Sequence, residues 1–125
     1  MKSATPVHIL IIDDNEDMLV MLAILLRDKG HTVTARRSFD DFESEIVAMQ
    51  PNLVLVDKNL GWADGLLLCR LIRDNPSTRS VPVIIFSAYP LSLEECKASG
   101  ANAFFEKPNG MAAFLNDIDT FLEQK

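Results

Sequence analysis

The sequence contains few of the residues that form metal–sulfur sites or nucleic-acid-binding faces. Its 2 cysteines, Cys69 and Cys96, do not fall at metal-ligand spacing, and we expect both to be reduced thiols of a cytoplasmic protein. Only 12 Lys and Arg stand against 18 Asp and Glu, which gives a formal net charge of -6. Direct binding to nucleic acid is therefore not expected, because phosphate contacts need clustered basic residues.

Long apolar runs are also missing. The longest run, 18–26, has nine residues, whereas a membrane-spanning helix needs roughly 20. Acidic residues precede this run where a secretory signal would carry positive charge, and no small-residue cleavage site follows it. With 125 residues, of which 48% are apolar and 24% charged, the chain suits one domain with its own core and no membrane contact.

What the sequence does contain is an alternation of short apolar runs with helical patterns. The runs 7–12, 53–57 and 81–86 are nearly continuous, which is typical of strands buried on both faces. Segment 103–105 reads as a short strand, and the polar–apolar alternation of 31–35 indicates a strand at the sheet edge. Because a helical pattern follows each strand, we predict an α/β fold with a parallel sheet between helices.

Several details of the predicted helices depend on tertiary packing. The helix that ends near Lys29 is apolar on almost every side, which indicates either extra burial or contact with a partner or second copy. The segment Ser38–Asp41 resembles a capping box for the next helix. The residues of the third helix that we expect to face inward are Leu67, Leu68, Leu71 and Ile72.

Polar side chains appear where the predicted strands end. These are Asp13 and Asp14 after the first strand, Asp57 after the third, Ser87 after the fourth and Lys107 after the fifth. We expect them to converge, because the carboxyl ends of parallel strands share one edge. Three clustered carboxylates repel one another unless a cation is bound, and an all-oxygen ligand set suits Mg²⁺ or Mn²⁺. A hydroxyl and an ammonium beside that cation suit phosphoryl transfer, with Asp57 as the nucleophile.

This pattern resembles the receiver domains of two-component response regulators, from Val7 to the end of the chain. The residues that carry the resemblance are the five strand-end residues together with Gly65, Ala88 and Pro108. The resemblance implies a flavodoxin-like (βα)5 fold, a doubly wound three-layer α/β/α structure with strand order 2-1-3-4-5. It also implies that residues 1–125 form a single receiver domain. We expect no output domain because the sequence ends with the fifth helix, and the receiver either stands alone or is cut from a longer protein.

The resemblance assigns a role to each matching residue. Asp57 would accept a phosphoryl group from a sensor histidine kinase or a histidine phosphotransfer protein. Asp13, Asp14 and Asp57 would hold Mg²⁺ (or Mn²⁺), and the backbone carbonyl of Asn59 would complete the protein ligands. Apart from its own phosphorylation and dephosphorylation, such a protein is not an enzyme.

The remaining roles concern switching. Lys107 would pair with the phosphoacceptor and its phosphoryl group, Ser87 would move toward the phosphate, and Phe104 occupies the switch position, where tyrosine is commoner. Gly61 stands where the family usually has proline, so we expect a more mobile loop before the third helix. Tyr89 is bulky beside the phosphate, and we expect it to slow attack by water.

Three alternatives share part of the pattern. A flavodoxin or dinucleotide-binding protein would need a glycine- or hydroxyl-rich loop after the first strand, where this chain is acidic. A haloacid-dehalogenase-type phosphatase would need a second acid two residues after the nucleophile, where Asn59 stands. A degenerate receiver that binds partners without phosphorylation remains open.

The resemblance also implies two interaction surfaces. The family's output surface, formed by the fourth helix, fifth strand and fifth helix, would bind a downstream partner or second copy, and the first helix would face the kinase.

Overall fold

The computed structural model describes residues 6–106 and 111–123. Five parallel strands form one sheet in the order β2-β1-β3-β4-β5. The strands are β1 (His8–Ile12), β2 (Thr32–Arg36), β3 (Leu53–Asp57), β4 (Val83–Ser87) and β5 (Ala103–Glu106). The flavodoxin-like order and the edge position of β2 are therefore confirmed.

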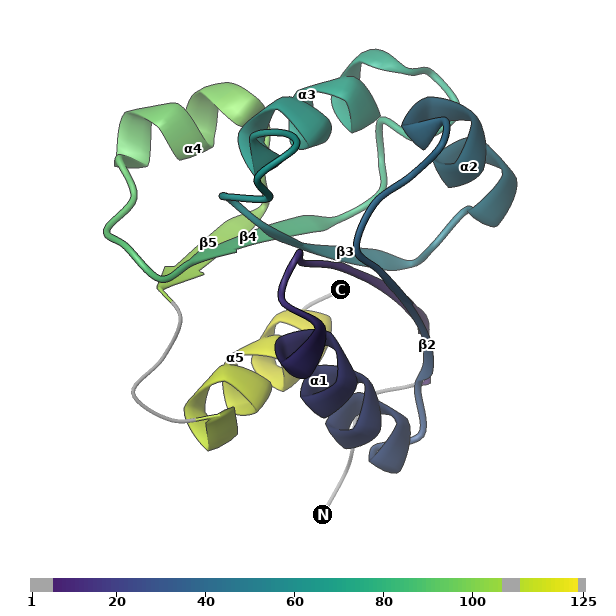
Figure 1. The fold of residues 1–125 in the computed structure, drawn as a ribbon, viewed down its shortest axis with the longest axis vertical. Helices are drawn as coiled ribbons and strands as arrows, with labels where there is room; N and C mark the ends of the chain where they lie inside the picture. Colours follow the sequence, from purple (N-terminus) through teal and green to yellow (C-terminus); the bar gives the residue numbers. More distant parts are fainter. Residues whose placement is uncertain (1–5, 107–110, 124–125) are drawn as a thin grey trace.

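Five helices cover the two faces of this sheet. They are α1 (Glu16–Asp28), α2 (Phe42–Met49), α3 (Gly65–Asp74), α4 (Leu93–Ser99) and α5 (Met111–Glu123). Figure 1 shows α2, α3 and α4 above the sheet and α1 and α5 below it, which makes three layers. A chain that alternates strand and helix reaches this arrangement because crossovers between parallel strands are right-handed.

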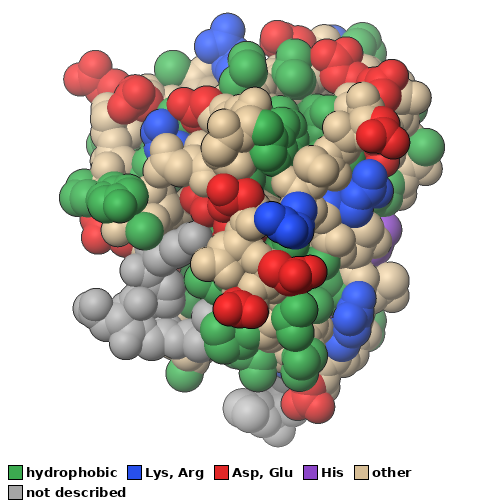
Figure 2. All heavy atoms as spheres, viewed as in Figure 1, with side chains coloured by type: hydrophobic (Ala, Val, Ile, Leu, Met, Phe, Trp, Pro, Cys, Tyr) green, Lys and Arg blue, Asp and Glu red, His purple; other side chains and the backbone are tan. Residues whose placement is uncertain are grey.

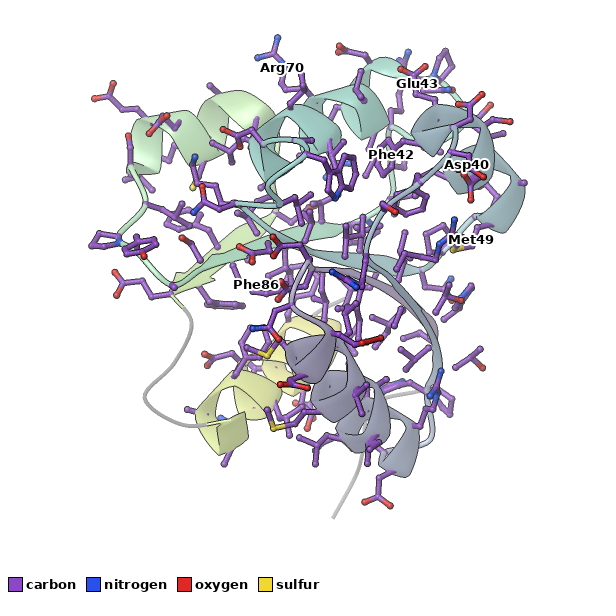
Figure 3. All side chains as sticks on the ribbon, viewed as in Figure 1. Asp40, Phe42, Glu43, Met49, Arg70 and Phe86 are labelled. Atoms are coloured by element: carbon purple, nitrogen blue, oxygen red, sulfur yellow. The ribbon has the colours of Figure 1, made fainter. Side chains whose placement is uncertain are left out.

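The central strand β3 has a core on both sides. All five of its residues are buried, with Val54 and Val56 packed under α2 to α4 and Leu53 and Leu55 packed toward α1 and α5. Phe86 of β4 points toward α5 (Figure 3), where its ring lies 5.5 Å from that of Phe114. Because each fully buried aliphatic side chain stabilises the fold by about 1.5–3 kcal/mol, β3 is a rigid support for the residue at its end.

The first helix has one buried face and one exposed apolar face. Its start is capped by Asn15, whose side-chain oxygen accepts the backbone N–H of Met18 at 3.1 Å. Of the outward residues, Val20 is 53% exposed, Met21 43% and Ile24 59%, and Figure 2 shows hydrophobic side chains gathered over α1. The face that Leu19, Leu22, Ala23 and Leu26 form is buried. The intramolecular core thus leaves part of the apolar surface of α1 exposed.

The second helix begins later than the capping-box pattern predicted. Its N-cap is Asp41, whose carboxylate accepts the backbone N–H of Ser44 at 3.2 Å. Glu45 accepts the backbone N–H groups of Asp40 and Asp41 at 3.1 and 3.0 Å. The assignment of Ser38 as the cap was wrong, because Phe39 packs against Phe42 at 5.0 Å between ring centroids and stays in the loop.

The prediction for the inward face of α3 was wrong at one position. Leu67 is 54% exposed, while Leu66, which was not assigned to that face, is 9% exposed. The cause lies at the start of the helix, where the backbone of Gly65 packs against the carbonyl of Asp57 and fixes the rotation of α3. Leu68 and Ile72 are buried as expected, and Leu71 is half-buried.

Both cysteines are free and buried. Burial raises the pKa of the Cys69 thiol and of the Cys96 thiol, so both are protonated at neutral pH. Neither cysteine is in a disulfide, and both side chains belong to the core under α2 to α4. Within residues 6–106 and 111–123, no helix combines the length and the apolar character that crossing a membrane requires.

A buried histidine links the start of β2 to the start of the chain. His31 is 5% exposed, and its Nδ1 accepts the backbone N–H of Val7 at 3.2 Å. Burial lowers the pKa of His31 below 6.5, the nearby Asp119 raises it, and Lys29 lowers it further. Protonation of Nδ1 would remove the acceptor of the Val7 hydrogen bond.

We therefore expect the free energy of unfolding to fall as the pH drops below the unfolded-state pKa near 6.5. In that range the unfolded chain binds a proton that folded His31 resists, so the stabilisation is complete at pH 7.5 and is lost toward pH 5. The effect on melting temperature is on the order of a few °C. Thermal unfolding of wild type and His31→Gln across this range measures it, and parallel pH profiles of the two proteins would contradict it.

Candidate functional site

Three carboxylates meet at the carboxyl edge of the sheet. Asp13 follows β1, and Asp57 is the last residue of the adjacent β3. With Asp14, each offers a carboxylate oxygen, and these atoms all lie within 4.8 Å of one another. Figure 2 shows acidic side chains near the middle of the face that this edge presents. The parallel register of β1 and β3 brings together residues that are 44 positions apart in the sequence.

Two of the three carboxylates are buried and held by short loops. Asp13 is 0% exposed, and its Oδ1 accepts the backbone N–H of Asn15 at 3.0 Å. Asp57 is 5% exposed, and its Oδ1 accepts the backbone N–H of Asn59 at 3.1 Å. Asp14 is exposed to solvent. The cluster is thus fixed on its inner side and open on one side, and its oxygen donors suit a hard divalent cation such as Mg²⁺ or Mn²⁺.

The eight-residue spacing between Asp57 and Gly65 has a steric cause in this chain, because the helix α3 starts directly against the backbone of Asp57. A Cβ atom at Gly65 would lie 2.2 Å from the carbonyl oxygen of Asp57. The backbone N–H of Gly65 donates to the carbonyl of Lys58 at 2.7 Å. Glycine is required here because α3 approaches β3 closely, at a point where any side chain would push the two apart.

The hydroxyl of Ser87 lies on the neighbouring strand at the same edge. Ser87 is 0% exposed and ends β4, which is paired with β3. Its Oγ accepts the backbone N–H of Tyr89 at 3.1 Å, and the side chain of Tyr89 is 69% exposed. Lys107, the predicted counter-charge, lies outside the described residues. β5 ends one position earlier, at Glu106, which is paired with Ser87.

The predicted switch residue Phe104 lies in β5 opposite Ile85. It is half-buried and packs against the core under α2 to α4. It therefore lies beside β4, which carries Ser87, on the face of the sheet that α2 to α4 cover.

The loop before α3 takes a path that proline could not follow. Gly61 has a φ of +81°, whereas proline is fixed near −65°. The loop is closed by a hydrogen bond from the backbone N–H of Leu60 to the carbonyl of Ala63 at 3.1 Å. An antiparallel bridge also joins Asn59 and Asp64. Gly61 therefore allows a turn that proline would prevent, and this turn is closed by its own backbone hydrogen bonds.

Two residues beside the site had no signal in the sequence. The indole N–H of Trp62 donates to the carbonyl of Arg37 at 2.7 Å, and the Nε of Arg37 donates to the carbonyl of Asp14 at 3.2 Å. Neither residue belongs to a recognisable motif, and 25 positions separate them. Only the folded arrangement of the β2–α2 and β3–α3 loops brings them together.

Comparison with known proteins identifies the family to which this fold belongs. The family model of the response regulator receiver domain matches residues 9–119. The chain belongs to the response regulator receiver family. The phosphoacceptor chemistry of this family is consistent with the carboxylate cluster at the sheet edge. Receiver domains serve two-component signalling and are not classical enzymes.

Relatives of this receiver occur both as short and as long proteins. It is 26% identical to the polar-differentiation response regulator DivK of Brucella anthropi, with 94% of this chain and 97% of DivK covered. It is 30% identical to protein RcaC of Microchaete diplosiphon, with 82% of this chain but only 16% of RcaC covered. The receiver thus spans nearly all of one relative and a small part of the other.

One similar solved structure contains a bound metal ion. The receiver domain of a sensor histidine kinase from Pseudomonas aeruginosa is 25% identical to this receiver, with a TM-score of 0.80 and coverage of 95% and 99% of the two chains. In that structure a magnesium ion is coordinated in the active-site cleft. Receiver domains bind Mg²⁺ at an acidic site, and in this receiver the acidic cluster is formed by Asp13, Asp14 and Asp57.

Proposed function

We propose that this receiver accepts a phosphoryl group on Asp57 from a sensor histidine kinase or a histidine phosphotransfer protein. The observation that carries the proposal is the placement of Asp57. It ends the fully buried central strand, and its carboxylate lies within 4.8 Å of the carboxylates of Asp13 and Asp14. In the transfer, a carboxylate oxygen of Asp57 attacks phosphorus, and the bond from phosphorus to the donor's imidazole nitrogen breaks.

The residues at the sheet edge fit a bound Mg²⁺, with Mn²⁺ as an alternative. Asp13, Asp14 and Asp57 would hold it, and the backbone of Asn59, whose N–H already bonds to Asp57, would offer its carbonyl. When bound, the metal supplies positive charge that neutralises the carboxylates and the incoming phosphoryl oxygens. The buried Asp13 and Asp57 keep their orientation through hydrogen bonds to backbone N–H groups, so the site is arranged before the phosphoryl donor arrives.

The other site residues would act on the phosphorylated form. Ser87, buried at the end of β4, would turn its hydroxyl toward the phosphoryl group. Lys107, outside the described residues, would pair with a phosphoryl oxygen. Phe104, packed beside β4 on the face that α2 to α4 cover, would adjust its side chain as β4 moves. In this way phosphorylation at one edge would reach the surface formed by α4, β5 and α5.

We propose that output passes through protein binding. Residues 1–125 would act as one cytoplasmic receiver unit, whose α4–β5–α5 surface contacts a downstream protein or a second copy. The phosphoryl donor would approach on the side of α1, where Val20, Met21 and Ile24 form an exposed apolar strip. Neither surface would bind nucleic acid or a membrane directly.

Tyr89 is proposed to slow the loss of phosphate. It follows Ser87 by two residues, its backbone N–H donates to the Ser87 Oγ, and its side chain is exposed rather than in the core. Tyr89→Ala is therefore expected to speed dephosphorylation severalfold, because water gains access to phosphorus. The decay of the phosphorylated protein, followed by mass spectrometry, measures this rate. Leu93→Ala, which shortens another exposed side chain, is the control. Equal dephosphorylation rates for wild type and Tyr89→Ala would contradict this role of Tyr89.

Incubation with acetyl phosphate tests the proposed function against its nearest alternative. If the receiver accepts phosphate, one phosphoryl group is added to the intact protein, and the addition requires Mg²⁺ or Mn²⁺. If the chain is a binding module that works without phosphorylation, no addition occurs with either metal or with a histidine phosphoryl donor. The same site geometry would then serve only to shape the binding surface.

A further inference from the structure

The β3–α3 loop is held from outside by a surface tryptophan. Trp62 is 43% exposed, yet its indole N–H donates to the carbonyl of Arg37 at 2.7 Å. The indole also meets the ring of Phe39 edge-on, with 6.4 Å between centroids. A tryptophan with a bonded N–H and a packed ring edge is fixed in position rather than free in solvent.

The carbonyl that Trp62 contacts belongs to a residue that also contacts the β1–α1 loop. The Nε of Arg37 donates to the backbone carbonyl of Asp14 at 3.2 Å. Arg37 directly follows β2, the strand that pairs with β1. Two hydrogen bonds in series therefore connect Asp14 to Trp62 through Arg37, over the top of the sheet edge.

The loop that carries Trp62 also lies close to the carboxylate cluster. Gly61 precedes Trp62, and a Cβ atom at Gly61 would lie 3.2 Å from the Oδ2 of Asp14. The loop from Asn59 to Asp64 is closed by its own bridge and turn. Because the loop is one compact unit, the position of Trp62 sets the distance from the backbone of Asn59 and Gly61 to Asp14.

The support behind Trp62 is itself braced against α2. The ring of Phe39 packs against that of Phe42, labelled at the start of α2 in Figure 3, with 5.0 Å between centroids. The guanidinium of Arg36 lies over the Phe39 ring at 4.6 Å and also pairs with Glu45 of α2 at 2.5 Å. The Trp62 contact thus joins the metal-site loops to a rigid part of the fold.

We propose that Trp62 and Arg37 are positioning residues that set the affinity of the carboxylate cluster for Mg²⁺. The inference rests on the proposed function, because it takes the cluster as a metal site. The two hydrogen bonds hold Asp14, the most exposed of the three carboxylates, against the loop that carries Asn59. Groups that orient metal ligands without touching the metal commonly tune its affinity.

Calorimetric titration with Mg²⁺ of four proteins tests this link: wild type, Trp62→Phe, Arg37→Lys and the double variant. Trp62→Phe keeps a ring beside Phe39 but has no N–H, and Arg37→Lys keeps the charge but loses the Nε donor. Each single variant is expected to raise the Kd for Mg²⁺ about 3- to 10-fold, the effect of one lost hydrogen bond. Since the bonds act in series, the double variant should bind no more weakly than the weaker single variant.

Two further measurements separate positioning from packing. Leu67→Ala shortens an exposed side chain on α3 and should leave the Kd unchanged. Thermal unfolding without metal should be nearly the same for wild type and Trp62→Phe. A lower melting temperature with an unchanged Kd would show that Trp62 serves packing alone and would overturn the inference. Multiplied effects in the double variant would also overturn it, because the two bonds would then act separately.

The titrations distinguish a failure of the proposed function from a failure of the inference about Trp62 and Arg37. If wild type binds neither Mg²⁺ nor Mn²⁺ in the titration, the metal site itself is wrong and the inference is lost with it. If wild type binds Mg²⁺ and both single variants bind it equally well, only the Trp62–Arg37 link is wrong. The wild-type titration therefore comes first.

Discussion

Asp57→Asn is expected to abolish phosphoryl incorporation from acetyl phosphate or from a histidine donor. Asparagine fills the same space at the end of β3, but its amide is a poor nucleophile and forms no acyl phosphate. The buried position of Asp57, 5% exposed at the end of a strand packed on both faces, keeps the surrounding fold in place. The measurement is the mass of the intact protein after incubation with donor and Mg²⁺.

Asp64→Asn is the matched control for that experiment. Asp64 caps α3 by accepting the backbone N–H of Leu66 at 2.8 Å, and asparagine caps helices about as well. It also pairs with Lys58 at 3.1 Å, and such a surface ion pair contributes little to stability. Asp64→Asn should therefore be phosphorylated like wild type. Phosphate retained in Asp57→Asn, or lost in Asp64→Asn, would show that another carboxylate is the acceptor.

Gly65→Ala is expected to destabilise the fold by roughly 2–3 kcal/mol, the cost of forcing an extra methyl group into a packed site. The added Cβ would lie 2.2 Å from the carbonyl oxygen of Asp57 and 3.0 Å from the Cα of Lys58. Both neighbours are backbone atoms, so no side chain can swing aside to relieve the contact. The helix α3 must move away from the end of β3, and urea denaturation measures the lost free energy of unfolding.

The sign of this effect separates the steric explanation from helix propensity. Without the contact, alanine in a helix would be more stable than glycine by about 0.5–1 kcal/mol. Leu67→Ala, in the same helix but 54% exposed, should change the stability little. A stability of Gly65→Ala equal to or above that of wild type would contradict the close approach of α3 to Asp57. The same displacement should also slow phosphorylation, because it moves the backbone that carries the acceptor.

Much of the fold and the carboxylate cluster could be predicted from the sequence, because strand burial leaves a strong local pattern. The run from Leu53 to Val56 is apolar on both faces, and the first charge after it marks the strand end. The rule that parallel strands end at one edge then brings Asp13 and Asp57 together without knowledge of any contact. Lys107 was assigned by the same rule, and its place in the site remains a prediction.

The wrong predictions concern positions where the local sequence does not distinguish buried from exposed residues or one helix start from another. Leu66, Leu67 and Leu68 are chemically alike, so the rotation of α3 depends on where Gly65 meets β3, which is a tertiary contact. Ser38 is a good capping residue locally, but the packing of Phe39 moves the start of α2. The Trp62–Arg37 bond uses a backbone carbonyl as its acceptor, and a carbonyl leaves no trace in the identity of the residue.

The tryptophan of the β3–α3 loop, Trp62, gives this protein an internal fluorescent probe. Trp62 is the single tryptophan of the chain, and its indole is bonded and partly exposed next to the cluster. Tryptophan emission therefore originates from one loop and from no other part of the molecule. If the receiver binds Mg²⁺ and accepts a phosphoryl group as proposed, tryptophan emission would follow both events in unlabelled protein, because Trp62 directly follows Gly61, whose backbone faces Asp14.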